Sequence, residues 1–174
     1  FASSFARGAI VYKETDPDFS RLLTSKAIDA FNHGLKNPGV CQTAPGSAPY
    51  FYEEDNWVDD MELAASELYN LTQEQIFLDY AIEFGRQEIV TPWIGRDTAL
   101  HYQWYPFVNM GHPEIARIQK KTGKDEFEGY KRKGLEITEL KAKKNPFLIG
   151  VPFIWCSNNL VSSNGHQIKV PDLT

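Results

Sequence analysis

The chain has 174 residues and a mass of 19.8 kDa, enough for one globular domain and too little for two ordinary ones. Hydrophobic residues make up 42% of it, and with the 12 glycines this composition excludes intrinsic disorder as its main character. Its 18 basic and 23 acidic residues leave a net charge of -5, which argues against a broad basic face for nucleic acid. No uncharged apolar run reaches the roughly 18 residues of a membrane-spanning helix. We therefore expect a soluble protein with neither a nucleic-acid nor a membrane partner.

The cysteines and the chain ends add little about the compartment. Cys41 and Cys156 are too few for a disulfide scaffold and lack the close spacing of a zinc site, and the sequence does not say whether they pair. The chain opens at Phe1 without a signal peptide and ends at Thr174 without an obvious terminal element. We expect residues 1–174 to form one incomplete segment of a longer chain.

The first predicted helix starts after Asp16 and stops before Pro38. Asp16 followed by Pro17 is a typical pair of N-cap and first helical residue, and the dipeptide Pro38-Gly39 ends helices. Apolar residues recur between them at spacings of three and four, as on one helix face: Phe19, Leu22, Leu23, Ala27, Ala30 and Phe31.

A pair of helices is predicted in the middle of the chain. Carboxylates crowd residues 52–62, where the dipole at a helix start favours them, with Asp55 or Asn56 as the cap. Thr72 and Gln75 match a capping box that would begin the second helix, which we expect to end before Gly85. The predicted inner faces comprise Trp57, Met61, Ala64, Ala65 and Leu68 on the first helix, and Phe77, Tyr80, Ala81 and Phe84 on the second.

Further helices are predicted over residues 99–110, interrupted at Pro106, over 113–118, and over 125–144. Residues 147–161 begin as an apolar run that reads as an element buried in the centre. No stretch sustains the alternation of a strand, and a loop followed by a helix pair recurs about every 40 to 50 residues. The pattern therefore predicts an all-α stack of helical hairpins.

Three groups of residues could carry chemistry. The first is the acidic run of residues 53–60, where two carboxylates could act as acid and base or could simply cap a helix. The residues alone favour capping, but aromatic side chains flank the run, and rings beside carboxylates are suited to sugars. The second group spans residues 93–104, between two tryptophans. The third follows Trp155, where Asn158 and Asn159 are either loop clamps or ligand contacts.

Familiar catalytic signatures are missing from the sequence. It has no phosphate loop, dinucleotide fingerprint, nucleophile elbow, zinc-protease motif or EF-hand loop. His112 and His166 each stand alone in the sequence, without a neighbouring motif that would make them ligands or bases.

Residues 52–69 (YEEDNWVDDMELAASELY) and residues 145–161 together resemble glycoside hydrolase family 9. This family comprises inverting cellulases and cellodextrin-cleaving enzymes built on an (α/α)6 barrel. The resemblance extends over residues 1–161 and implies that the chain is the central part of such a barrel.

The resemblance also implies a sugar-binding groove at the end of the barrel where the inner helices begin. Tyr52 and Trp57 match an aromatic wall of this groove, Trp155 matches a tryptophan platform, and Trp104 matches another tryptophan although the loop lengths around it differ. The implied substrate-binding residues are Tyr52, Trp57, Asp59, Asp60, Trp104, Trp155, Asn158 and Asn159.

The sequence departs from the family at two points. The family often has an arginine a few positions after the last tryptophan, where this chain has Asn158 and Asn159. Inversion also needs an acid and a base roughly 6.5–9.5 Å apart. The family's base lies in an Asp-Ala-Gly-Asp-like motif that the sequence lacks, and its acid lies beyond the last residue given. No catalytic residue is identified, and we expect the chain alone to be inactive.

The leading interpretation is a segment of an enzyme that hydrolyses β-1,4-glucan or cello-oligosaccharides. The alternative is a non-catalytic carbohydrate-binding or scaffold domain, and a third option places an acid and a base within residues 53–60 as a minimal hydrolase. No cofactor is expected; calcium occurs in some members of the family, but no ligands are assigned to it here. The resemblance implies secretion or a periplasmic location. Besides a β-glucan or oligosaccharide, we expect self-association or contact with the rest of a longer chain.

Overall fold

The computed structural model describes residues 1–39, 57–87 and 110–150. Within these ranges the chain is helical and contains no strand, as the sequence predicted. The helices are α1 (Ala2–Tyr12), α2 (Pro17–Lys36), α3 (Val58–Thr72), α4 (Gln75–Gln87), α6 (Gly111–Lys120) and α7 (Glu126–Ala142). None of the helices in this part of the chain is both long and apolar enough to cross a bilayer.

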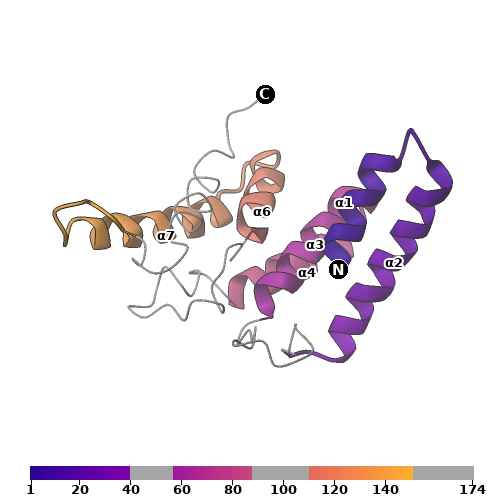
Figure 1. Ribbon diagram of the computed structural model, residues 1–174, viewed down its shortest axis with the longest axis horizontal. Helices are drawn as coiled ribbons and strands as arrows, with labels where there is room; N and C mark the ends of the chain where they lie inside the picture. The colour runs from indigo at the N-terminus through magenta and orange to yellow at the C-terminus, as the bar shows by residue number, and fades with distance from the viewer. Residues whose placement is uncertain (40–56, 88–109, 151–174) are drawn as a thin grey trace.

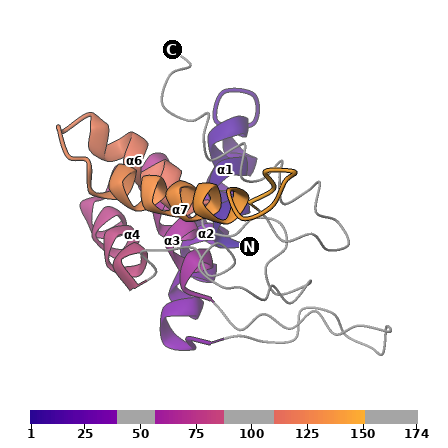
Figure 2. The same cartoon turned by 90° about the vertical axis from the view of Figure 1, so that its left-hand side faces the viewer.

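The helices form three successive pairs, α1 with α2, α3 with α4, and α6 with α7 (Figure 1). The first helices of the pairs pack on one another, because α3 contacts both α1 and α6. We call α1, α3 and α6 the inner helices. Figure 2 looks along the same row of pairs from the α7 end. The predicted stack of helical hairpins is therefore confirmed for the described residues.

Helix α2 begins as predicted, since the Asp16 side chain accepts a hydrogen bond of 3.0 Å from the backbone N–H of Phe19. Ala27 and Phe31 are buried, but Phe19 is 39% and Leu22 53% exposed. The predicted buried face is thus wrong for the first turns of α2. The physical reason is that the α1–α2 turn extends beyond the α3–α4 pair, so nothing among these helices covers it (Figure 1).

Helix α1 is the element that the sequence pattern did not predict. Its buried residues are Ala2, Ala6 and Ala9, which recur at helical spacing but are small. Alanines give a weak apolar signal, yet they allow the backbone of α1 to approach α2 and α3 closely. Ser20 of α2 completes this contact by donating a 2.7 Å hydrogen bond to the carbonyl oxygen of Ala9.

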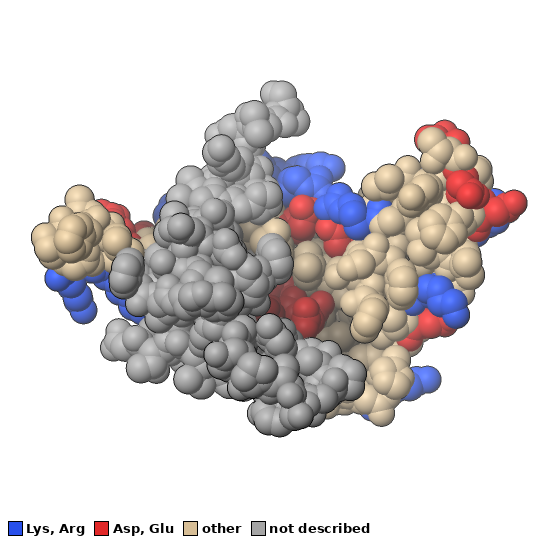
Figure 3. Space-filling view, in the orientation of Figure 1, with Lys and Arg blue, Asp and Glu red and all other residues tan. Residues whose placement is uncertain are grey.

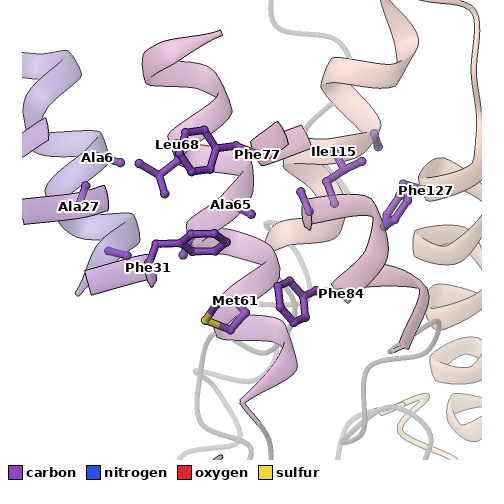
Figure 4. Packing of buried hydrophobic residues seen from close by; sticks show 14 residues of the cluster. Ala6, Ala27, Phe31, Met61, Ala65, Leu68, Phe77, Phe84, Ile115 and Phe127 are labelled. Atoms are coloured by element: carbon purple, nitrogen blue, oxygen red, sulfur yellow. The ribbon is translucent and has the colours of Figure 1, made fainter. Parts of the chain in front are cut away.

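The predicted inner face of α3 is confirmed, because Met61, Ala64, Ala65 and Leu68 are all buried. Figure 4 shows this face between the aromatic side chains of α2 and α4 and the residues that α6 and α7 contribute. The face predicted for α4 is confirmed as well: Phe77, Ala81 and Phe84 are buried and Tyr80 packs against them.

The capping box predicted at Thr72 and Gln75 is wrong. Thr72 still belongs to α3, where its hydroxyl donates to the carbonyl oxygen of Leu68 at 2.9 Å. The helix ends at Thr72, and its C-cap residue Gln73 has a left-handed conformation with φ of 60°. The Gln75 side chain then bonds to Asp79 at 2.8 Å instead of returning to Thr72.

Gly85 does not end α4, as the sequence suggested, because the helix continues to Gln87. Gly85 is needed inside the helix for close packing. A Cβ atom placed on it would lie 2.2 Å from Cε1 of Phe127 in α7 and 3.0 Å from Oε1 of Glu62 in α3. The glycine therefore marks a contact between three helices.

Helices α6 and α7 agree with the prediction to within two residues. Helix α6 starts at Gly111, ahead of Pro113, which is tolerated because the first N–H groups of a helix have no partner within it. Phe147 and Leu148 are 81% and 70% exposed, so the predicted buried element is wrong at its start. Asn145 holds these residues in a turn, since its side chain donates to the carbonyl oxygen of Ile149 at 2.8 Å. Residues 151–161, the predicted helix over 99–110 up to residue 109, and both cysteines lie outside the described residues.

Candidate substrate-binding end of the inner helices

The inner helices run parallel and begin at the same end of the molecule. At this end a Cβ atom on Gly111, the first residue of α6, would lie 2.6 Å from Cγ of Glu62 in α3. Further along all three helices, Arg7 of α1 lies 2.6 Å from Glu67 of α3 and 3.6 Å from Glu114 of α6. Contacts at two matching levels make α3 and α6 parallel, and the effect of the Phe1 amino group on Asp60 places the start of α1 at the same end. The positive ends of the helix dipoles therefore converge, which favours carboxylates and other oxygen ligands there.

Trp57, Asp59 and Asp60 lie at this N-terminal end. Trp57 is half-buried, and its ring meets Phe84 of α4 edge to face at a centroid distance of 6.0 Å. Asp59 is half-buried and Asp60 is exposed, both in the first turn of α3. Acidic side chains reach the surface near the middle of the face in Figure 3. The structure thus brings together one aromatic ring and two carboxylates that the sequence singled out.

The cap predicted for this helix is corrected. Neither Asp55 nor Asn56 is the N-cap residue, because α3 begins at Val58 and its N-cap is Trp57. Trp57 has φ of -135° and ψ of -8°, so the chain becomes helical only after it, and its side chain makes no capping hydrogen bond. The first-turn carboxylates of α3 therefore stabilise the helix start through the dipole rather than by capping.

The remaining predicted substrate-binding residues lie outside the described residues and stay predictions: Tyr52, Trp104, Trp155, Asn158 and Asn159.

A buried pair that the sequence did not reveal lies beneath this end. His112 stood alone in the sequence, but in the structure its Nδ1 lies 2.5 Å from Oε1 of Glu62, and the two side chains are 4% and 0% exposed. The His112 ring packs edge to face on Phe127 at 5.1 Å and beside Tyr130 at 5.7 Å. No local motif could have signalled a pair separated by fifty positions, because it forms only when α3 and α6 lie side by side.

Burial raises the pKa of Glu62, because a charged carboxylate loses its hydration there. The hydrogen bond and the charge of His112 oppose this shift, and the negative charge of Asp59 adds to it. At the surface end, the surrounding protein atoms displace part of the hydration of Asp60 and raise its pKa, which the Phe1 amino group only partly offsets. Protons are therefore held more tightly here than on ordinary carboxylates.

A second polar cluster joins the inner helices further from this end. Besides its contacts with Arg7, Glu114 accepts hydrogen bonds from Asn70 at 3.1 Å and Arg117 at 2.9 Å. Burial raises the pKa of Glu67, which the adjacent Arg7 partly offsets. Every member of the cluster has a partner of opposite character, so we assign it to bracing α1, α3 and α6.

The described residues offer no group of three or more histidine, cysteine or acidic side chains that could hold a metal ion. This finding concerns residues 1–39, 57–87 and 110–150, and no calcium ligands are assigned among them.

The folded protein is expected to lose stability as the pH rises from about 5 towards about 8. Asp60, Glu62 and Glu67 have pKa values raised above their ordinary values of 3.8, 4.5 and 4.5. The folded state therefore keeps protons that the unfolded chain releases, and the resulting stability is fully present below the unfolded pKa and is lost as the pH rises through the folded pKa. Thermal melts across this range would check it, and Glu62→Gln should flatten the slope.

At acidic pH, the dependence of the protein's stability on pH has the opposite sign. Hydrogen bonds of 2.7 and 2.9 Å from Arg86 lower the pKa of Glu126, so its contribution is present above the unfolded pKa and is lost as the pH falls through the folded pKa. Stability should pass through a maximum between the acidic range, where it rises with pH, and the higher range, where it falls. A stability that rises steadily to about pH 8 would contradict the assignment of the buried carboxylates.

Comparison with known proteins gives the following matches. The family model described as "Glycosyl hydrolase family 9" matches residues 1–169. Endoglucanase 10 of Arabidopsis thaliana is 29% identical over 86 residues, which cover 49% of this chain and 16% of that protein. An endoglucanase of Phaseolus vulgaris is 27% identical over 126 residues, covering 68% of this chain and 24% of that protein.

Solved structures show the same fold. AaCel9A, in complex with cellobiose-like isofagomine, matches with a TM-score of 0.67 at 19% identity over 99% of this chain and 33% of its own. A Bacteroides ovatus structure titled "GH9" matches with a TM-score of 0.62 at 18% identity over 97% of this chain and 33% of its own. These structures are (α/α)6 barrels, and the likeness confirms the predicted fold class. The chain spans about a third of the solved structures and a quarter or less of these two plant relatives.

Proposed function

Because this chain belongs to glycosyl hydrolase family 9, we propose that it supplies part of the sugar-binding end of an enzyme that hydrolyses β-1,4-glucan or cello-oligosaccharides with inversion. The curated relatives that it matches are named endoglucanases, which supports this substrate class. The observation that carries the proposal is the convergence of Trp57, Asp59 and Asp60 at the common N-terminal end of the inner helices.

The residues at this end have the chemistry that a glucan needs. The exposed part of the Trp57 ring offers an apolar face for the C–H surface of a glucose unit. Asp59 and Asp60 offer carboxylate oxygens that accept hydrogen bonds from sugar hydroxyls, and both lie in the first turn of α3. An aromatic platform beside fixed acceptors therefore orients one sugar ring.

These residues bind substrate and do not perform the catalytic step in our proposal. Consecutive residues of a helix point in different directions, so Asp59 and Asp60 cannot face each other across a scissile bond. Glu62 is fully buried against His112 and cannot reach a substrate. Neither carboxylate motif of the family occurs in the sequence, so we expect the acid and base to come from outside residues 1–174.

The missing motifs also favour a second candidate, a non-catalytic carbohydrate-binding domain. The two functions are separated by assaying two polypeptides: the 174-residue chain, and a longer one that carries it together with the rest of a family 9 catalytic domain. Our proposal expects reducing sugar from soluble β-glucan with the longer polypeptide and none with the chain. If the longer polypeptide binds glucan without cleaving it, the binding-domain function replaces our proposal.

Replacing Trp57 with alanine is expected to weaken cellopentaose binding roughly five-fold, because one stacked ring contributes on the order of 1 kcal/mol. Calorimetric titration of the longer polypeptide, well below its melting temperature, measures this change. Trp57→Tyr keeps a ring against Phe84 and should lose less affinity. Ile76→Ala, an exposed apolar position in the first turn of α4, is the control and should bind like the unchanged protein. Equal affinities for all four proteins would remove Trp57 from the site.

Family membership also supports an extracellular or periplasmic location as part of the proposal. Self-association of the 174-residue chain, and the roles predicted for Tyr52, Trp104, Trp155, Asn158 and Asn159, remain predictions that the same titrations and a sedimentation experiment would test.

A further inference from the structure

The buried pair of Glu62 and His112 has no place in the proposed binding of glucan, although it lies directly beneath the binding end. Its side chains come from two different hairpins, Glu62 from α3 and His112 from α6. Helix α4 closes one side with Gly85, and α7 closes another with Phe127 and Tyr130. Four helices therefore meet at one carboxylate and one imidazole.

The backbone around the pair leaves room for these two side chains and little else. A Cβ atom on Gly111 would lie 2.6 Å from Cγ and 2.7 Å from Cδ of Glu62, and one on Gly85 would lie 3.0 Å from its Oε1. Both glycines are buried. The Glu62 carboxylate thus packs directly against the backbones of α4 and α6 at these two glycines. A shift of α3 against α6 would break its 2.5 Å contact with His112.

The charges around the pair make each partner depend on the other. On α3, Asp59 is negative and repels Glu62. On α4 and α7, Arg86 is engaged by Glu126, which also accepts a 2.8 Å hydrogen bond from the Tyr130 hydroxyl. Among the described residues, His112 is the group that hydrogen-bonds to the Glu62 carboxylate. Removing one member of the pair leaves the other buried between α3 and α6 without this hydrogen-bond partner.

The pair is connected to the binding residues on both sides. Asp59 lies one helical turn before Glu62, so the two share a face of α3. Phe84, which holds the Trp57 ring, immediately precedes Gly85, which contacts Phe127 and approaches Glu62. A displacement at the pair would therefore move both the aromatic and the acidic part of the binding end.

We propose that Glu62 and His112 are positioning residues: they lock the first turns of α3 and α6 together and thereby hold Trp57 and Asp59 in the geometry that binds glucan. The inference rests on the proposed function for its substrate and on the 2.5 Å buried contact for its mechanism. Neither Glu62 nor His112 lies in a recognisable sequence motif. The inference predicts that both nevertheless affect substrate affinity.

The test compares variants of a longer polypeptide that carries this chain with the rest of a family 9 catalytic domain. Glu62→Ala and His112→Ala are expected to raise the KM for cellopentaose and its dissociation constant about tenfold, with a smaller change in kcat, because misplaced binding groups lose affinity. His112→Asn places an amide N–H near the position of Nδ1 and should restore most of the affinity.

Glu67→Ala is the matched control. Glu67 is also a buried carboxylate of α3, but its partner is Arg7, at 2.6 Å, in the cluster away from the binding end. We expect this variant to melt at a lower temperature and yet to bind cellopentaose within about twofold of the unchanged protein. If Glu67→Ala weakens binding as much as Glu62→Ala does, the pair contributes only stability and the inference is wrong.

A second measurement separates the inference from the proposed function. Amide hydrogen exchange in the second turns of α3 and α6, where the N–H groups are bonded within the helix, should accelerate in Glu62→Ala and His112→Ala and stay unchanged in Glu67→Ala. If the unchanged protein neither binds nor cleaves β-glucan, the proposed function fails and the substrate part of the inference fails with it. Unaltered exchange in both pair variants would overturn the positional part, whatever the binding result.

Discussion

Replacing Phe31 with alanine should lower the free energy of unfolding by about 3–5 kcal/mol, the range for deleting a large ring from a core. Phe31 is 1% exposed and joins α2 to α4. Its ring meets Phe77 at 5.8 Å and Tyr80 at 5.6 Å, both edge to face. Figure 4 shows it beside Ala65 and Met61 of α3, and the small Ala65 side chain cannot fill the cavity that removal of the ring leaves.

Chemical denaturation measures this loss, with Leu22→Ala as the control on the same helix. Leu22 is 53% exposed, so its truncation should change the free energy of unfolding by less than about 0.5 kcal/mol. Equal losses for the two variants would show that α2 is not anchored through Phe31.

Gly85→Ala should cost about 1–3 kcal/mol or more, through overpacking rather than a cavity. The added Cβ would lie 2.2 Å from Cε1 and 2.7 Å from Cζ of Phe127. The Phe127 ring cannot give way, because it is 0% exposed and is packed between His112 and Tyr130 at 5.1 Å from each. Helices α3, α4 and α7 must therefore move apart where they meet at Gly85.

The matched control is Gly129→Ala in α7. A Cβ atom on Gly129 has no atom within 4 Å, and the residue is exposed inside a helix. This change should stabilise the protein by about 0.5–1 kcal/mol, because alanine has the higher helix propensity and narrows the unfolded ensemble. Melting temperatures that shift in opposite directions would support the packing role of Gly85, whereas two increases would contradict it.

Local sequence patterns were sufficient to predict most of the helices. Asp16 and Pro17 start α2, and the spacing of Met61, Ala64, Ala65 and Leu68 identifies the buried face of α3, because both signals act within one or two turns. The pattern failed at α1, where the buried residues are alanines, and at Gly85, where a packing glycine looks like a helix end. It also failed at Phe147 and Leu148, which are apolar but exposed.

The candidate site divides in the same way. Trp57, Asp59 and Asp60 could be named from the sequence because they are neighbours at one helix start, and a ring beside carboxylates has recognisable chemistry. Glu62 was not singled out, since a glutamate in the first turns of a helix is ordinary. His112 was judged isolated because nothing near it in the sequence suggests a partner.

By itself, therefore, the sequence determined an all-α chain of helical pairs, its family likeness and the part of the site that lies within one helix turn. The tertiary structure alone decided that the inner helices run parallel, that Arg7 reaches Glu67 and Glu114, and that Glu62 meets His112. The physical reason is that periodicity and capping depend on neighbouring residues. A buried hydrogen-bonded pair depends on two distant backbones approaching within hydrogen-bonding distance, and only the packing of the hairpins brings them there.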